Sequence, residues 1–225
     1  MLPQAGAPRA SRSAGLLASF RHALRGLVEV AARERNMRLH LFAGLVVGVA
    51  GSEVPLALAA QLGLFLCVTL VLAGEALNSA LEALVDLHTV AFRHEARRVK
   101  DAAAGAVLAL AAGAVLSAAA ILAGHWTEFL ASWSVGRAGL DGALLGLAAA
   151  VLGLRLARAV VVAMSAAGAG LLALLALRSV SLPFTALAAA LFVWAVAAQR
   201  RGTSPRPTGA AQRGDCDTAG RGETR

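Results

Sequence analysis

A group of polar side chains follows a long apolar stretch of the sequence. No charged residue lies between Val54 and Gly74, yet the next twelve residues contain two glutamates, an aspartate, an asparagine and a serine. At about 100° per residue, these five side chains share one face of a helix. A charged side chain at membrane depth is costly, and it marks a functional site by default. The polar stripe consists of Glu75, Asn78, Ser79, Glu82 and Asp86.

Spacing alone leaves three interpretations of this polar stripe open. The helix could leave the membrane after Gly74, in which case water solvates the stripe. The carboxylates could instead form a proton or cation path, as intramembrane acids commonly do. They could also bind Mg²⁺, because Glu75 and Glu82 lie about 10 Å apart along a helix and carry the hard oxygens that Mg²⁺ shares with phosphate groups.

A single lysine favours phosphate chemistry. Lys100 is the only lysine beside twenty arginines, and Asp101 follows it directly. Its compact ammonium differs from a guanidinium in charge density and geometry, although chance retention of one lysine is the alternative. A lysine for phosphate charge, carboxylates for Mg²⁺ and a carboxylate base are the parts of a phosphoryl-transfer site. The sequence contains neither a G-x-x-x-x-G-K-S/T loop nor a protein-kinase signature.

The composition predicts an integral membrane protein. Hydrophobic residues make up 58% of the 225 residues and charged residues 15%, against about 25% charged in soluble domains. Four uncharged stretches approach the roughly 20 residues that a helix needs to cross a bilayer. We therefore expect an all-α protein, with spans near residues 39–53, 54–86, 101–124, 138–154, 159–177 and 180–198.

The distribution of arginine predicts the topology. The formal net charge is +8, but the basic residues gather in alternating connections, which favours a membrane-orientation signal over nucleic-acid binding. With these connections in the cytoplasm, six spans place both termini inside. The first and fourth spans are short, so four or five spans remain possible. Arg155, Arg158 and Arg178 lie at span ends, where we expect them to reach for headgroups.

The remaining segments have simpler expectations. Residues 13–35 carry apolar and basic side chains on opposite faces, which predicts an amphipathic helix in the membrane interface. Residues 1–12 and 200–225 are expected to be disordered. Small residues recur at every fourth position after Asp101, a pattern that permits close helix packing in lipid. They are Gly105, Ala109, Gly113 and Ser117.

Four stretches of this sequence resemble the prokaryotic diacylglycerol kinase family, which includes undecaprenol kinases. They are "SFRHALRGL" from Ser19, "ERNMRLH" from Glu34, "GEALNSALEALVDL" from Gly74 and "KDAAAGAVL" from Lys100. The order and separation of these stretches match those of the family, and the resemblance covers about residues 13–124.

The resemblance implies roles for individual residues. Glu75 would be the general base that accepts the proton of the lipid hydroxyl. Glu34 and Glu82 would bind the Mg²⁺ that bridges the phosphates of ATP. Asn78, Lys100 and Asp101 would complete the ATP-binding site, with Lys100 at the phosphates. Ser79 and Asp86 would support it.

The resemblance also implies an architecture and a location. An interfacial helix and three membrane helices would form the kinase domain, residues 13–124, and would assemble as a homotrimer with active sites between subunits. The site would face the cytoplasm, in the inner membrane of a bacterium. Residues 125–199 exceed the usual length of the family, and we interpret them as about three further membrane helices of unknown role.

The sequence therefore predicts an ATP- and Mg²⁺-dependent lipid kinase that converts diacylglycerol to phosphatidic acid in phospholipid metabolism. Undecaprenol is the alternative acceptor, favoured by the form of "ERNMRLH". An alternative from another class is a non-enzymatic membrane protein or ion pathway that uses Glu75 and Glu82. That alternative is weak, because Gln61 and Thr69 are the only side chains of comparable polarity before Glu75 in its span.

Overall fold

The chain folds into helices joined by short connections. The computed structural model describes residues 12–88, 94–132, 135–154 and 158–202, and in these ranges it contains helices and no strand, which confirms the all-α prediction. Of the residues predicted to be disordered, 1–11 and 203–225 fall outside the described residues. The prediction is wrong for Arg12 and for residues 200–202, which continue the helices α1 and α8. The helices are α1 (Arg12–Arg33), α2 (Arg35–Glu53), α3 (Leu58–His88), α4 (His94–Gly124), α5 (Trp126–Ser132), α6 (Val135–Gly153), α7 (Arg158–Arg178) and α8 (Leu182–Gly202).

The protein is a membrane protein by the length and composition of its helices. Within the described residues, α3, α4, α7 and α8 are each long and apolar enough to cross a bilayer. All six predicted spans form helices. The first and fourth spans, predicted to be short, correspond to α2 and α6 and are the weaker candidates for crossing a bilayer. Helix α2 has 19 residues, and the apolar segment of α6 is shorter still. Pro183 lies in the first turn of α8, where its missing N–H costs no helical hydrogen bond.

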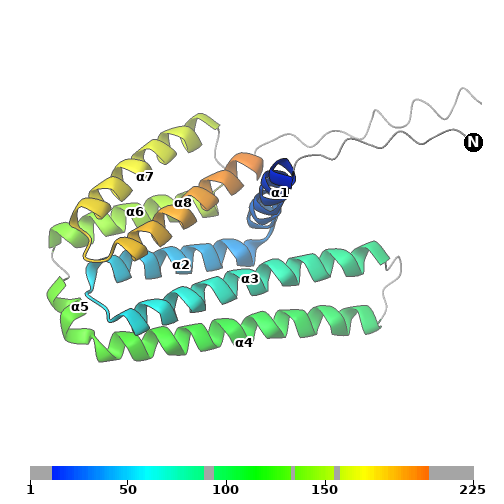
Figure 1. Cartoon of the computed structure of the whole chain (residues 1–225), viewed down its shortest axis with the longest axis horizontal. Coiled ribbons are helices and arrows are strands. Elements are labelled where there is room, and N and C mark those ends of the chain that lie inside the picture. The colour runs from blue at the N-terminus through cyan, green and yellow to red at the C-terminus, as the bar shows by residue number, and fades with distance from the viewer. Residues whose placement is uncertain (1–11, 89–93, 133–134, 155–157, 203–225) are drawn as a thin grey trace, which may run out of the picture.

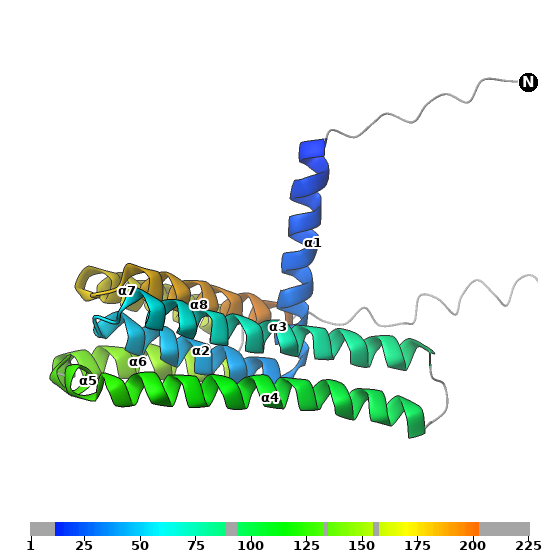
Figure 2. The same cartoon turned by 60° about the horizontal axis from the view of Figure 1, so that its bottom comes forward.

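The helices form two groups side by side (Figure 1). The long helices α3 and α4 run together as a hairpin, and α2 lies along them. On the other side of α2 lie α8, α6 and α7. Helix α1 stands across the end of this bundle (Figure 2), while the connected end of the α3–α4 hairpin extends beyond it. This arrangement brings the corner between α1 and α2 beside the middle of α3.

The corner between α1 and α2 is a break of one residue. Glu34 has an extended backbone, with φ −88° and ψ 126°, so it ends α1 and precedes the first residue of α2. Arg38 reaches back from α2, and its Nη1 donates a hydrogen bond to the carbonyl of Ala32 at 3.2 Å. A carbonyl at the end of a helix lacks an intrahelical partner, and this bond satisfies one.

Close packing between helices depends on glycines of α2 rather than on the predicted stripe of α4. A Cβ placed on Gly48 would lie 3.0 Å from the backbone nitrogen of Ala188, and one on Gly51 would lie 2.7 Å from the ring of Phe184. The predicted stripe named no partner, and its two glycines make no close contact within the described part of this chain. Gly105 and Gly113 have no atom within 4 Å of an added Cβ, because α4 packs on α3 through another face. All four residues of the predicted stripe are exposed.

One hydrophobic core joins α2 to the last three helices. Leu41 and Leu45 of α2, Leu144 of α6, Leu175 of α7 and Phe192 of α8 are all almost fully buried in it. Ala31 of α1 belongs to the same cluster and is completely buried. The division into a kinase domain and a second domain after residue 124 remains a prediction.

An ion-pair network crosses between the two groups of helices. Arg178, at the end of α7, pairs through Nη2 with Asp141 of α6 and lies 3.7 Å from Oε1 of Glu53, at the end of α2. The side chains of Asp141 and Glu53 are only 4% and 3% exposed. The expectation that Arg178 reaches for headgroups is therefore wrong, because two buried carboxylates hold its guanidinium inside the protein. Arg155 and the side chain of Arg158 lie outside the described residues.

Candidate active site

The polar stripe of α3 is partly buried. Glu75 is 3% exposed and Asn78 7% exposed, although α3 continues as a helix to His88. Nδ2 of Asn78 donates a hydrogen bond to Oε1 of Glu82 at 2.9 Å, one turn further along the helix. The hydroxyl of Ser79 donates to the backbone carbonyl of Glu75 at 3.0 Å, so it is engaged within α3. Burial of Glu75 and Asn78 disfavours the interpretation that water solvates the whole stripe.

Glu34 joins this stripe from the corner between α1 and α2. Its carboxylate lies close enough to Glu75 to interact with it electrostatically, as does the carboxylate of Glu82. Glu34 precedes the first residue of α2, but its side chain makes no capping hydrogen bond. Its carboxylate is therefore not used to begin the helix. Glu75 therefore lies within electrostatic range of carboxylates from two separate parts of the sequence.

These carboxylates suit a hard divalent cation. In the described parts of the chain, no lysine or arginine forms an ion pair with Glu34, Glu75 or Glu82, and the buried Oδ1 of Asn78 has no hydrogen-bond partner. Like charges at close range are unfavourable unless a cation or a proton compensates them. Oxygen ligands of this kind fit Mg²⁺, which typically binds one or two carboxylates together with water and substrate phosphates. Within the described residues, no group of three or more acidic, histidine or cysteine side chains is arranged to hold a metal ion by itself.

The other predicted site residues lie towards the connected end of the hairpin. Nζ of Lys100 pairs with Oδ1 of Asp86 at 2.5 Å, and this contact joins α4 to α3. Asp86 follows Glu75 by eleven residues, or about 16 Å along the helix. Asp101 is 70% exposed and lies 3.5 Å from Nε of Arg97 on its own helix. The structure therefore brings Glu34, Glu75, Asn78 and Glu82 together and holds Lys100, Asp86 and Asp101 further along the hairpin.

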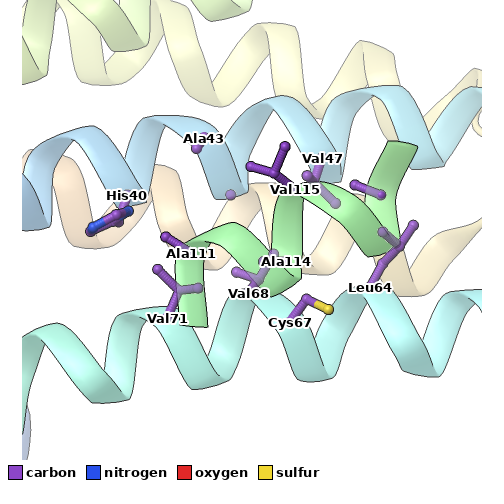
Figure 3. A pocket seen from close by; sticks show the side chains of 12 residues that line it. His40, Ala43, Val47, Leu64, Cys67, Val68, Val71, Ala111, Ala114 and Val115 are labelled. Carbon is purple, nitrogen blue, oxygen red and sulfur yellow. The ribbon is translucent and has the colours of Figure 1, made fainter. Parts of the chain in front are cut away.

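An apolar cavity lies beside the carboxylates, between α2, α3 and α4 (Figure 3). Its volume is about 140 Å³. His40 and Val71 lie at one end of it and Leu64 at the other. Glu75 follows Val71 by one helical turn, so the cavity ends near the carboxylates. Sequence reasoning missed this cavity, because its lining is mostly alanine and valine spread over three helices. The lining includes Ala43, Val47, Cys67, Val68, Ala111 and Ala114.

Comparison with known proteins places the first half of the chain. The family model described as "Prokaryotic diacylglycerol kinase" matches residues 21–122. A diacylglycerol kinase of Synechocystis sp. is 43% identical over 108 residues, which are 48% of this chain and 62% of that protein. An undecaprenol kinase of Bacillus subtilis is 41% identical over 93 residues, which are 41% of this chain and 76% of that protein. No solved structure matches the chain.

The matched region contains every predicted site residue. It begins within α1 and ends within α4, so it covers the corner at Glu34, the polar stripe of α3 and Lys100. Helices α5 to α8 lie outside it. The B. subtilis protein is matched over more than two thirds of its length at well above 30% identity. This chain belongs to the prokaryotic diacylglycerol kinase family.

Proposed function

We propose that this protein is a lipid kinase that transfers the γ-phosphoryl group of ATP to the hydroxyl of diacylglycerol and forms phosphatidic acid. One observation carries the proposal: in a member of this family, the buried Glu75 lies one helical turn beyond Val71, which lines one end of an apolar cavity, and within electrostatic range of two further carboxylates. The cavity suits hydrocarbon, and the carboxylates suit a proton transfer and a nucleotide-bound cation. Both substrates would meet where α3 leaves the apolar part of the bundle.

We propose that Glu75 acts as the general base. As the lipid hydroxyl oxygen bonds to the γ-phosphorus of ATP, the bond from that phosphorus to the bridging oxygen breaks and ADP leaves. The hydroxyl proton passes to the carboxylate of Glu75. Partial burial restricts the access of water to this carboxylate, which favours the lipid hydroxyl over water as the acceptor.

Glu34 and Glu82 are the residues that would hold Mg²⁺. The bound ion would neutralise charge on the β- and γ-phosphates. Asn78 donates a hydrogen bond from Nδ2 to the carboxylate of Glu82, and its own buried Oδ1 has no hydrogen-bond partner. We propose Lys100 as a phosphate contact, released from Asp86 or shared with it. Asp101, Ser79 and Asp86 would act as supporting groups.

The assembly and location follow the same reasoning. We propose a homotrimer in the bacterial inner membrane, with the site on the cytoplasmic side. The exposed small residues of α4 support assembly, because they would let a helix of a neighbouring subunit approach closely. The clustering of arginine in alternating connections supports the orientation.

Undecaprenol is the second candidate acceptor, because one relative bears the name undecaprenol kinase. Transfer of labelled phosphate from ATP in lipid–detergent micelles distinguishes the two, with dioleoylglycerol in one set and undecaprenol in the other. Labelled phosphatidic acid is the expected product. Label in undecaprenyl phosphate alone would replace diacylglycerol with the second acceptor, and no label in either lipid from folded protein would contradict the kinase proposal.

A further inference from the structure

Helix α8 contacts both helices that meet at Glu34 (Figure 2). It packs along α2 over most of its length and also reaches the C-terminal half of α1. The family match ends at residue 122, so α8 belongs to the part of the chain outside it. A helix that holds both sides of a corner fixes the angle of that corner.

Two side-chain contacts join α8 to α1. The indole Nε1 of Trp194 donates a hydrogen bond to the backbone carbonyl of Leu27 at 3.1 Å. Nη1 of Arg201 lies 3.1 Å from Oε2 of Glu29, whose other carboxylate oxygen pairs with Arg33 at 2.5 Å. The hydrogen bond from Arg201 holds the pKa of Glu29 below its usual range, against the opposing effect of burial.

The indole contact is the stronger of the two. Arg201 and Glu29 are 40% and 39% exposed, and ion pairs of that exposure add little stability. Trp194 is half-buried against the core that contains Ala31, Ala195 and Ala198. Leu27 and Glu29 lie seven and five residues before Glu34, so both contacts fall within about the last two turns of α1 before the corner.

The contact with α2 leaves little room for adjustment. Gly48 faces the backbone of Ala188, and Gly51 faces the ring of Phe184, at distances where an added side chain would force its neighbour to move. Helix α8 is therefore fixed against α2, and its contacts with α1 set the angle between α1 and α2. Since Glu34 is the single extended residue between them, the same contacts set where its carboxylate lies relative to Glu75.

We infer that α8 is an intramolecular brace, in which Trp194 and Arg201 act as positioning residues for Glu34 and so for the metal–nucleotide site. The inference rests on the proposed function, since Glu34 matters here as a metal ligand. The inference gives α8, which lies outside the family match, a role in the reaction of the matched region. It would hold Glu34 in position, which a connection of a single extended residue would not do alone.

The test compares Trp194→Phe with Trp126→Phe in the full-length protein. Phenylalanine keeps the aromatic packing and removes the indole donor. Trp126 is a matched control, because it lies on α5, is 50% exposed and stacks on Phe129 of the same helix. It takes no part in the contacts between α8 and α1. The first readout is hydrogen exchange of peptides covering residues 27–37. The second is the affinity for Mn²⁺ in the presence of a non-hydrolysable ATP analogue, with Mn²⁺ as a paramagnetic probe.

Trp194→Phe should speed exchange in residues 27–37 and weaken Mn²⁺ binding by roughly 2- to 10-fold, as expected for one lost hydrogen bond. Trp126→Phe should change neither. A second pair controls for general misfolding: Arg201→Glu should change both readouts in the same direction as Trp194→Phe but less, and adding Glu29→Arg should restore part of the effect. Exchange in α3 and α4 should stay unchanged throughout.

Unchanged Mn²⁺ affinity in Trp194→Phe, with or without faster exchange, would overturn the positioning role. Failure of the proposed function has a different signature. Wild-type protein that binds Mn²⁺ with the nucleotide but phosphorylates neither lipid would refute the lipid-kinase proposal and leave the brace intact. Wild-type protein that binds no Mn²⁺ with the nucleotide would overturn both.

Discussion

The ion-pair network of Arg178 gives a quantitative prediction about how the two groups of helices hold together. Arg178→Met would keep an apolar stem and remove the cation that faces Asp141 and Glu53. Both carboxylates are at least 96% buried, so the variant removes a cation that offsets their charge inside the protein. Breaking a buried ion pair by removing one partner costs about 3–5 kcal/mol.

This cost corresponds to a lower melting temperature. For proteins of 150–250 residues, 1 kcal/mol shifts Tm by about 2–4 °C, so Arg178→Met should lower it by roughly 6–20 °C. The assay is thermal unfolding in detergent, followed by tryptophan fluorescence. The matched control is Arg97→Met, because Arg97 pairs with Asp101 while 67% exposed and should cost less than about 1 kcal/mol.

The loss of stability should come from removing a cation beside two buried carboxylates, and not from the missing side-chain volume. Adding Asp141→Asn and Glu53→Gln to Arg178→Met should therefore recover at least half of the lost Tm. A Tm for Arg178→Met within 2 °C of the control, or a neutralised triple variant less stable than the single one, would refute the account of this network.

Three further predictions address the cavity, the packing of α2 and the contact of Glu29. Ala114→Phe should fill the cavity and raise the KM for lipid while the KM for ATP stays unchanged; an equal rise in both would contradict a lipid-binding cavity. Gly51→Val should cost about 1–3 kcal/mol by overpacking, whereas Gly105→Val, in open space, should cost little in thermal unfolding of the monomeric protein. Because the pKa of Glu29 is lowered below 4.5, its contribution is fully present above that pH and is lost as the pH falls through the lower folded value. Exchange in residues 27–33, corrected for intrinsic rates, should thus rise only below about pH 4.5, and a rise near neutral pH would contradict the role of this contact.

Much of the site could be predicted from the sequence because its residues lie on one helix. A regular helix places Glu75, Asn78 and Glu82 on one face whatever surrounds it, so their spacing alone was sufficient to predict that they lie together. The motif that begins at Glu34 added a residue from a separate segment. The fold of the first half followed from apolar length and from the amphipathic pattern of residues 13–35, which forms α1 over Arg12–Arg33.

The features that were missed depend on contacts between distant segments. Arg178 looks like a residue at a membrane boundary until the bundle places Asp141 and Glu53 beside it. Small residues occur on both α2 and α4, and their spacing cannot tell which stripe meets a partner within the chain. The brace by Trp194 joins residues 167 positions apart, so no local pattern indicates it.

The most direct test of the central claim is phosphate transfer from ATP to diacylglycerol by Glu75→Gln, compared with wild type and with Glu128→Gln. Glutamine keeps the size of the side chain and removes its ability to accept a proton, while Glu128 is an exposed glutamate on α5, remote in the sequence from the stripe. General-base catalysis contributes about 10²- to 10⁴-fold, so Glu75→Gln should lose at least about 100-fold in kcat. Glu128→Gln should match wild type. Transfer by folded Glu75→Gln at a rate close to wild type would contradict the assignment of Glu75 as the base.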